Sequence, residues 1–248
     1  MADLLSNAFE SIGLNNRPRV SVVVPTRGTK PARLDRALRS ILAQTLSPHE
    51  IIIVVDGDAR AAARIAPPPG PCKVAVLFLG QPSGGRPGAV RNRGCGAAHG
   101  DWVAFLDDDD AWAPDKLRQQ LEALKHDGTR FCCTTAVGTP APARRRLVLS
   151  DIMERNCVVC SSVLVCMTVL RSARCFGDER YGQDWRCWQR CLAHTDGSYL
   201  SEPLVQLNDD AADLDRSTVR KEGRQALHAA LGEKGPAVLA AQFAGFMK

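Results

Sequence analysis

Continuous apolar runs alternate with amphipathic segments through the first half of the chain. Apolar runs that end at proline, glycine or aspartate predict buried strands at 20–25, 50–55, 73–79 and 102–106. Between the first two runs, Leu34, Leu38, Ile41 and Leu42 recur at helical spacing. Strands that are apolar on both faces are typical of parallel sheets covered by helices. The β-α-β order therefore predicts an open, doubly wound α/β sheet.

The second half of the chain is patterned less regularly. The sequence predicts a helix from Pro114 to Lys125, a strand over Val158–Leu170, and a helix from Asp184 to Ala193. The segment 138–146 is rich in proline and arginine and predicts a mobile loop. Beyond Asn208 the composition shifts to alanine and charged residues, which predicts a helical C-terminal extension.

Composition and charge narrow the class of protein. Of 248 residues, 45% are apolar and 24% charged, which excludes collagen-like, disordered and disulfide-scaffold chains. The net charge of +5 is too small and too dispersed to indicate a nucleic-acid partner. The longest nearly uncharged apolar run, 157–170, is shorter than the roughly 20 residues of a membrane-spanning helix. Residues 1–16 lack the basic cluster of a secretory signal. We therefore expect a cytoplasmic protein without a transmembrane segment.

The ten cysteines are expected to be reduced and mostly buried, because the chain lacks the features of a small secreted scaffold. One alternative stays open. Cys157 and Cys160, together with Cys187 and Cys191, have spacings found among zinc ligands. Against a zinc site, the first pair begins an expected strand and the second pair lies on an expected helix.

Four consecutive aspartates, Asp107–Asp110, follow the strand at 102–106. Carboxylates this close repel one another, so the arrangement is costly unless a cation or solvent compensates it. Magnesium and manganese prefer such oxygen ligands and are typically held by one or two carboxylates plus substrate phosphates. Ligands of open α/β sheets bind outside the carboxyl ends of the strands, where Asp56 also falls. The sequence thus predicts a metal and phosphate site, with a solvated acidic turn capping the next helix as the alternative.

Three blocks of sequence, in order, resemble the family 2 glycosyltransferases. The first comprises VSVVVPT at 20–26, LDRALRSILAQT at 34–45 and IIIVVDG at 51–57. The second comprises GAVRNRG at 88–94 and GDWVAFLDDDDAW at 100–112. The third comprises FGDE at 176–179, GQDWRCW at 182–188 and SEPL at 201–204. The resemblance spans about residues 20–207.

The resemblance implies a GT-A fold, which is a Rossmann-like α/β domain with an open mixed sheet and helices on both faces. It divides the chain into an N-terminal extension (1–19), a catalytic domain (20–207) and a helical C-terminal extension (208–248). Within the catalytic domain, 20–112 would bind the nucleotide-sugar and 113–207 the acceptor.

The resemblance also assigns roles to individual residues. Pro25, Thr26 and Arg27 match the loop under the nucleobase, and Asp56 matches the aspartate that hydrogen-bonds the base. Arg91 matches the arginine near the nucleotide, and Arg86 is expected to add positive charge near the phosphates. The remaining assignments concern the Asp-x-Asp motif and the catalytic base: Asp107 and Asp109 would hold Mn²⁺ or Mg²⁺, Asp107 or Asp108 would lie nearer the ribose, and Asp184 would be the general base.

These assignments imply an inverting, metal-dependent transfer from a nucleoside diphosphate sugar, with a uridine donor expected. Arg27 stands where family members often place an aromatic residue, and Gln183 replaces a frequent glutamate. The Gln-x-x-Arg-Trp signature of processive synthases is absent, so we expect a non-processive enzyme. Asp184 as a simple helix cap remains an alternative.

Two rival functions and the acceptor stay open. A sugar nucleotidyltransferase would carry a glycine-rich loop with arginine after the first strand, where this chain has Pro25 and Thr26. A non-catalytic nucleotide- or sugar-binding module is the second rival. The acceptor is expected to be a small molecule, a glycan or a lipid-linked sugar. For a lipid-linked acceptor, Arg144–Arg146 could provide a peripheral membrane contact.

Overall fold

The apolar runs of the first half form the parallel part of a mixed sheet. The computed structural model describes residues 18–138, 145–153 and 156–208. β1 pairs in parallel with β2 and β4, and β2 pairs in parallel with β3. β2 is buried along its whole length, which explains why its sequence is apolar on both faces. These strands are β1 (Val20–Thr26), β2 (Glu50–Val55), β3 (Lys73–Phe78) and β4 (Trp102–Phe105).

The second half adds mostly antiparallel pairs to the same sheet. The strand order is β3-β2-β1-β4-β8-β6-β9-β5, with β7 paired to β9 beside this path. β8 runs antiparallel to β4 and β6, whereas β9 runs parallel to β6. The added strands are β5 (Ala111–Trp112), β6 (Phe131–Ala136), β7 (Arg146–Leu147), β8 (Leu164–Cys166) and β9 (Gly197–Gln206). The expected open mixed α/β sheet is confirmed.

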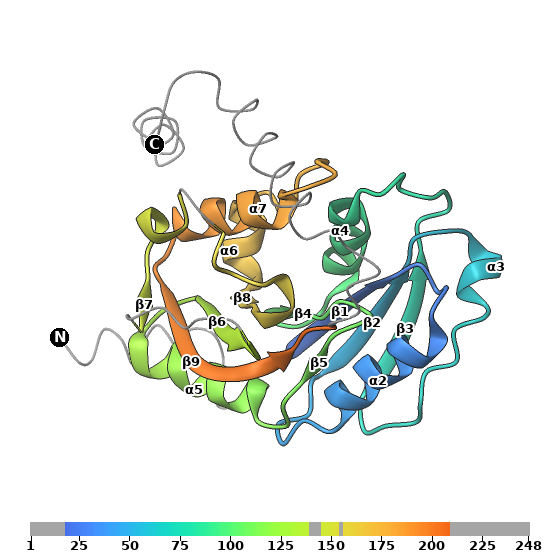
Figure 1. Cartoon of the computed structure of the whole chain (residues 1–248), viewed down its shortest axis with the longest axis horizontal. Helices are drawn as coiled ribbons and strands as arrows, with labels where there is room; N and C mark the ends of the chain where they lie inside the picture. Colours follow the sequence, from blue (N-terminus) through green and yellow to red (C-terminus); the bar gives the residue numbers. More distant parts are fainter. Residues whose placement is uncertain (1–17, 139–144, 154–155, 209–248) are drawn as a thin grey trace.

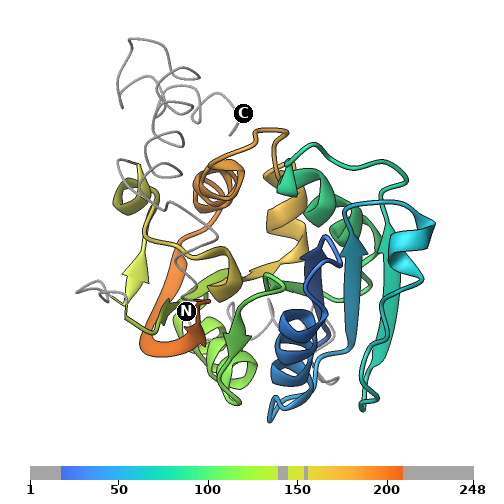
Figure 2. The same cartoon turned by 45° about the vertical axis from the view of Figure 1, so that its right-hand side comes forward.

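Helices cover both faces of the sheet (Figure 1). α4, α6 and α7 lie along one face, while α2 and α5 lie along the other, and Figure 2 shows the same layers from the side of β3. Proline occupies the first turn of α2 and of α4, where its missing N–H has no helical partner to lose. The helices are α2 (Pro31–Leu42), α3 (Ala59–Ala62), α4 (Pro87–Ala97), α5 (Lys116–Asp127), α6 (Met167–Ser172) and α7 (Gln183–Leu192).

The expected strand over Val158–Leu170 is wrong for most of its length. This run contains the 3-10 turn η2 (Cys160–Ser162), the short strand β8 and the helix α6. Ser162 explains the turn, because its N–H and its hydroxyl both donate to the carbonyl of Val159, at 2.9 and 2.7 Å. Side chains that bond their own backbone in this way compete with strand pairing. A second 3-10 turn, η1 (Leu149–Ile152), precedes it.

An aromatic cluster joins α7 to the centre of the sheet. The Trp188 ring lies 5.4 to 5.7 Å from the rings of Phe105, Phe131 and Phe176, measured between centroids. Trp188 is fully buried. Packed aromatic rings contribute roughly 0.5–1.5 kcal/mol per pair beyond their area. The cluster therefore fixes the position of α7, the helix that carries Asp184.

Parts of the expected organisation lie outside the described residues. These are the N-terminal extension up to residue 17, the C-terminal extension from residue 209, and residues 139–144 of the expected loop. Within the described ranges, none of the helices combines the length and the apolarity needed to cross a bilayer.

Candidate active site

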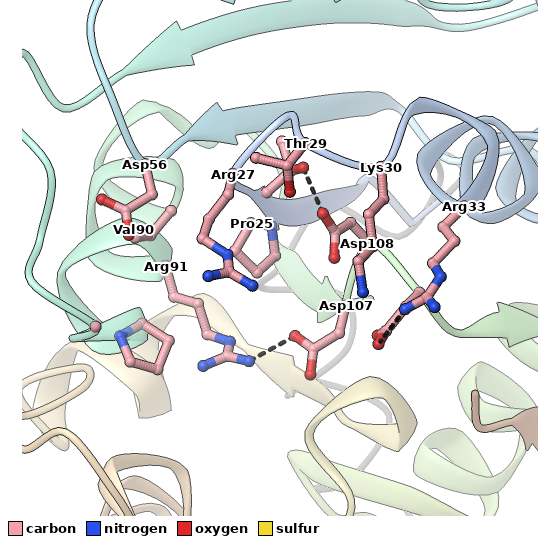
Figure 3. A pocket seen from close by; sticks show the side chains of 14 residues that line it. Pro25, Arg27, Thr29, Lys30, Arg33, Asp56, Val90, Arg91, Asp107 and Asp108 are labelled. Atoms are coloured by element: carbon pink, nitrogen blue, oxygen red, sulfur yellow. Dashed lines mark hydrogen bonds and ion pairs between the residues drawn. The ribbon is translucent and has the colours of Figure 1, made fainter. Parts of the chain in front are cut away.

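A pocket opens at the carboxyl ends of three parallel strands (Figure 3). Its volume is about 380 Å³, within the range of roughly 300–1,000 Å³ that small-molecule sites occupy. The sheet topology explains the position of the pocket, because ligands of open α/β sheets bind where the strands end. The lining residues lie at the end of β1 and into α2, after β2, before and in α4, and after β4: Pro25, Thr26, Arg27, Thr29, Lys30, Arg33, Asp56, Gly85, Pro87, Val90, Arg91, Asp107, Asp108 and Asp109.

The pairing register brings Thr26 beside Asp108. β1 and β4 pair Val23 with Phe105, and the same offset places Thr26 opposite Asp108. The Thr26 hydroxyl donates to the Asp108 carboxylate and accepts from the Gly28 N–H at 2.9 Å. Gly28 makes this turn at a φ of 68°, a conformation that glycine adopts without strain. Burial raises the pKa of Asp108, and the bond from Thr26 opposes that rise.

Arg91 reaches from α4 to the first aspartate of the run. Its Nη2 lies 2.5 Å from Oδ1 of Asp107, and its side chain is only 5% exposed. Burial alone would lower the pKa of the Arg91 guanidinium, but the Asp107 carboxylate, together with weaker contributions such as that of Asp184, opposes this, and the pKa is raised overall. Among the described residues, Nε and Nη1 of Arg91 are buried without a hydrogen-bond partner. Arg91 lines the pocket, and a buried cation with unsatisfied donors beside a pocket suits an anionic ligand.

The last two aspartates of the run face different surroundings. Asp109 lines the pocket, where its carboxylate lies 4.0 Å from Nη1 of Arg33. Asp110 is turned into the protein and is 6% exposed. Its oxygens accept hydrogen bonds from the Ser161 hydroxyl at 2.6 Å and from the Asn208 N–H at 3.1 Å. The resemblance gave Asp110 no role, and the structure separates this one buried carboxylate from the three at the pocket.

The donor set of the pocket fits a hard divalent ion. Asp107, Asp108 and Asp109 present carboxylate oxygens, the ligand type that Mg²⁺ and Mn²⁺ prefer. No group of three or more His, Cys, Asp or Glu residues in the described ranges is arranged to hold a metal alone. One or two carboxylates completed by substrate phosphates is the usual arrangement for magnesium. The same finding gives no support to the alternative zinc site of Cys157, Cys160, Cys187 and Cys191.

The base-binding candidate Asp56 is held by a residue that the sequence analysis missed. The N–H of Ser83 donates to Oδ1 of Asp56 at 2.6 Å, and the Ser83 hydroxyl donates to Oδ2 at 2.7 Å. Each carboxylate oxygen retains a lone pair for a further donor. Asp56 and Arg27 occupy equivalent positions across the β1–β2 register, so both lie at the same edge of the sheet.

Arg86 does not line the pocket. Its Nε lies 3.6 Å from the Asp178 carboxylate, and its Nη1 donates to the carbonyl of Ser83 at 3.2 Å. The remaining cationic pocket residues, Lys30 and Arg33, were absent from the expected site. Their spacing of three residues at the start of a helix that follows a strand end was the available signal.

Asp184 lies in the first turn of α7, beside the pocket rather than in its wall. Burial raises the pKa of its carboxyl, while the charge of Arg91 and the N–H of Trp185 lower it. The N-cap of α7 is Gly182 and no side chain caps the helix, so Asp184 lies in the first turn without being the simple helix cap anticipated as an alternative. The pocket residues Arg91 and Asp107 act on the pKa of Asp184 with opposite signs, the cation lowering it and the carboxylate raising it.

The basic patch considered for membrane contact is partly neutralised. Arg145 lies 3.4 Å from the Asp127 carboxylate, and Arg146 lies 2.7 Å from that of Asp196. Arg144 lies outside the described residues.

Comparison with known proteins gives one family and several relatives. The model of Glycosyl transferase family 2 matches residues 21–161. The succinoglycan biosynthesis protein ExoW of Rhizobium meliloti is 35% identical over 116 residues, which are 46% of this chain and 35% of that protein. The matches span only about a third of the first curated relatives.

Solved structures share the fold. Staphylococcus aureus TarS 1-349, in complex with UDP-GlcNAc, superposes with a TM-score of 0.61 at 18% identity, covering 76% of this chain and 58% of that one. The mannosyltransferase PcManGT from Pyrobaculum calidifontis, in complex with GDP-Man and Mn²⁺, superposes with a TM-score of 0.66 at 16% identity, covering 90% and 67%. At such identities the likeness establishes the fold alone.

Proposed function

Because the chain belongs to glycosyltransferase family 2, we propose that it is a metal-dependent, inverting and non-processive glycosyltransferase. Its donor is a nucleoside diphosphate sugar with uracil as the base. Its acceptor presents a hydroxyl or an amine on a small molecule, a glycan or a lipid-linked sugar.

The observation that carries this proposal is the charge pattern of the pocket. Three carboxylates, Asp107–Asp109, stand opposite the cations Arg27, Lys30, Arg33 and Arg91. A metal–diphosphate complex presents both signs of charge at once, so it suits such a wall better than a simple anion or cation. The buried guanidinium of Arg91, whose Nε and Nη1 have no hydrogen-bond partner among the described residues, supports an anionic ligand in particular.

The donor is bound by residues from two strand ends. Asp56 accepts a hydrogen bond from an N–H of the base, with Ser83 holding its carboxylate in place. Asp107 and Asp109 would hold Mg²⁺ or Mn²⁺, which would supply positive charge beside the diphosphate. Arg91 adds fixed positive charge near the phosphates.

The transfer itself needs one proton acceptor. The acceptor oxygen or nitrogen attacks the anomeric carbon, the bond from that carbon to the phosphate oxygen breaks, and the nucleoside diphosphate leaves. Asp184 takes the acceptor proton, a role that typically contributes a factor of roughly 10² to 10⁴. Attack opposite the leaving group inverts the configuration at the anomeric carbon.

A thermal-shift panel tests the donor. UDP, GDP, ADP and CDP are each added with MnCl₂ or with EDTA. We expect UDP with Mn²⁺ to stabilise the protein most, by about 2.7 kcal/mol at 100 times its dissociation constant. Stabilisation by GDP alone would contradict the uridine donor and keep the transferase, whereas no response to any diphosphate would contradict the proposed function.

A further inference from the structure

One side chain outside the proposed machinery contacts both ends of the aspartate run. Ser161, in η2, accepts a hydrogen bond from the N–H of Asp107 at 3.1 Å. Its hydroxyl hydrogen is donated to Oδ2 of Asp110 at 2.6 Å. Asp107 and Asp110 are the first and last residues of the run. A single hydroxyl therefore connects the two ends of the segment that presents Asp108 and Asp109 to the pocket.

Ser161 is itself held from the other side. Its carbonyl accepts a hydrogen bond from the indole Nε1 of Trp112 at 2.8 Å, and Ser161 is fully buried. The second oxygen of Asp110 accepts from the N–H of Asn208 at 3.1 Å. Buried hydrogen bonds of this kind fix geometry because breaking one leaves a desolvated polar group without a partner. The aspartate run is thus pinned at both ends.

We propose that Ser161 is a positioning residue for the metal ligands Asp107 and Asp109. This inference rests on the proposed function, since it assigns Ser161 to the support of that same metal site. Hydrogen bonds behind metal ligands orient them, and their loss typically costs roughly 10- to 100-fold in metal affinity. The hydroxyl of Ser161 acts through the backbone of Asp107 and the side chain of Asp110, without touching the metal.

The neighbouring Ser162 provides a matched control. It is also fully buried and belongs to the same 3-10 turn. Its hydroxyl donates to the carbonyl of Val159 at 2.7 Å, within its own turn. Ser162→Ala removes a buried hydroxyl from the same element. It keeps the backbone N–H of residue 162, which closes the turn on the carbonyl of Val159 at 2.9 Å, and it leaves the link to the aspartate run in place.

The test measures metal affinity directly. MnCl₂ is titrated into protein saturated with UDP, or with GDP if GDP is the nucleotide that shows metal-dependent stabilisation, and free Mn²⁺ is followed by electron paramagnetic resonance. Nucleotide affinity in EDTA is measured by calorimetry. We expect Ser161→Ala to weaken Mn²⁺ binding about 10-fold or more and to change nucleotide affinity in EDTA less than twofold. Ser162→Ala should change either quantity less than twofold.

A second variant, Ser161→Cys, keeps the proposal testable if Ser161→Ala does not fold. Ser161→Cys keeps nearly the same volume but replaces the hydroxyl by a weak hydrogen-bonding thiol, so it should also weaken Mn²⁺ binding. Mn²⁺ affinity within twofold of wild type in the folded variants would overturn the role of Ser161 and leave the proposed function standing. A wild-type protein that binds no diphosphate in a metal-dependent way would overturn both.

Discussion

The general-base role proposed for Asp184 depends on its carboxylate. Asp184→Asn preserves shape and removes the proton acceptor. We expect turnover to fall by roughly 10²- to 10⁴-fold, because proton removal from the acceptor loses its general base. Binding of UDP with Mn²⁺ should change less than twofold, since Asp184 does not line the pocket. Single-turnover kinetics and calorimetry measure the two quantities.

Asp178 supplies the control for this substitution. It lies in the segment that leads to α7, its side chain is 84% exposed, and its partner is Arg86. Asp178→Asn should leave turnover within about twofold, as is usual for exposed ion pairs. Full activity in Asp184→Asn would place the base elsewhere. Loss of nucleotide binding in that variant would assign Asp184 to the donor site instead.

Individual residues were predictable from sequence where a single residue type carried the signal. Carboxylates at a strand end indicated Asp107–Asp109, and all three line the pocket. Ser83 and Ser161 carried no such signal. Their partners lie 27 and 54 residues away along the chain, so only the folded structure brings them together.

At the scale of elements, α4 is packed closely against the segment that leads to α7. A Cβ on Gly88 would lie 2.2 Å from the carbonyl oxygen of Gly177. Asn92 donates from Nδ2 to the carbonyl of Phe176 and accepts from its N–H, both at 2.9 Å. The position of Asp184 relative to the pocket therefore depends on contact between two backbones.

Gly88→Ala tests this contact. Because the clashing atom is a backbone oxygen, the two segments must separate, and we expect a loss of roughly 1–3 kcal/mol in the free energy of unfolding. Gly96→Ala in the same helix meets nothing within 4 Å and should stabilise, by up to about 1 kcal/mol, through helix propensity. Urea unfolding measures the free energy of unfolding of both variants. Equal stability of the two variants would show that the approach at Gly88 is not tight.

The elements were predictable where local pattern decides structure. β1, β2 and β4 are buried on both faces, so their sequences are continuous apolar runs. The run over Val158–Leu170 is equally apolar but divides into three elements, because burial alone does not distinguish a helix from a strand. β9 was missed because it contains Glu202 and Pro203 and shifts register against β6.

At the scale of the whole molecule, the two halves of the sheet are built from the chain in different ways and have different roles. The parallel half is built from consecutive β-α-β units, and its strand ends form the pocket. The mixed half contributes Asp184 on α7 and Ser161 in η2. Its strand β9 pairs with β5, β6 and β7, and these long-range pairings leave no local trace in the sequence.

Because Lys116 is buried, its titration makes the free energy of unfolding of the whole molecule depend on pH. It is fully buried at the start of α5, where its Nζ lies 2.7 Å from Oε1 of Gln120 and 4.0 Å from the centroid of the Trp112 ring. Burial lowers the pKa of Lys116 to about 7. The ordinary lysine pKa, about 10.4, applies in the unfolded chain. Between these values the unfolded state binds one proton more than the folded state, so the free energy of unfolding rises with pH.

Lys116→Met removes the buried ammonium and keeps a side chain of similar length. We expect the variant to be more stable than wild type below pH 7, where the cost of burying the charge is fully present, and this advantage to shrink as pH rises toward 10. The change should amount to a few kcal/mol, since one unit of pKa corresponds to about 1.4 kcal/mol. Urea unfolding at pH 6, 8 and 9.5 measures it, with exposed Lys125→Met on the same helix as the control. A stability difference that does not vary with pH would mean that Lys116 keeps its ordinary pKa, held charged by Trp112 and Gln120.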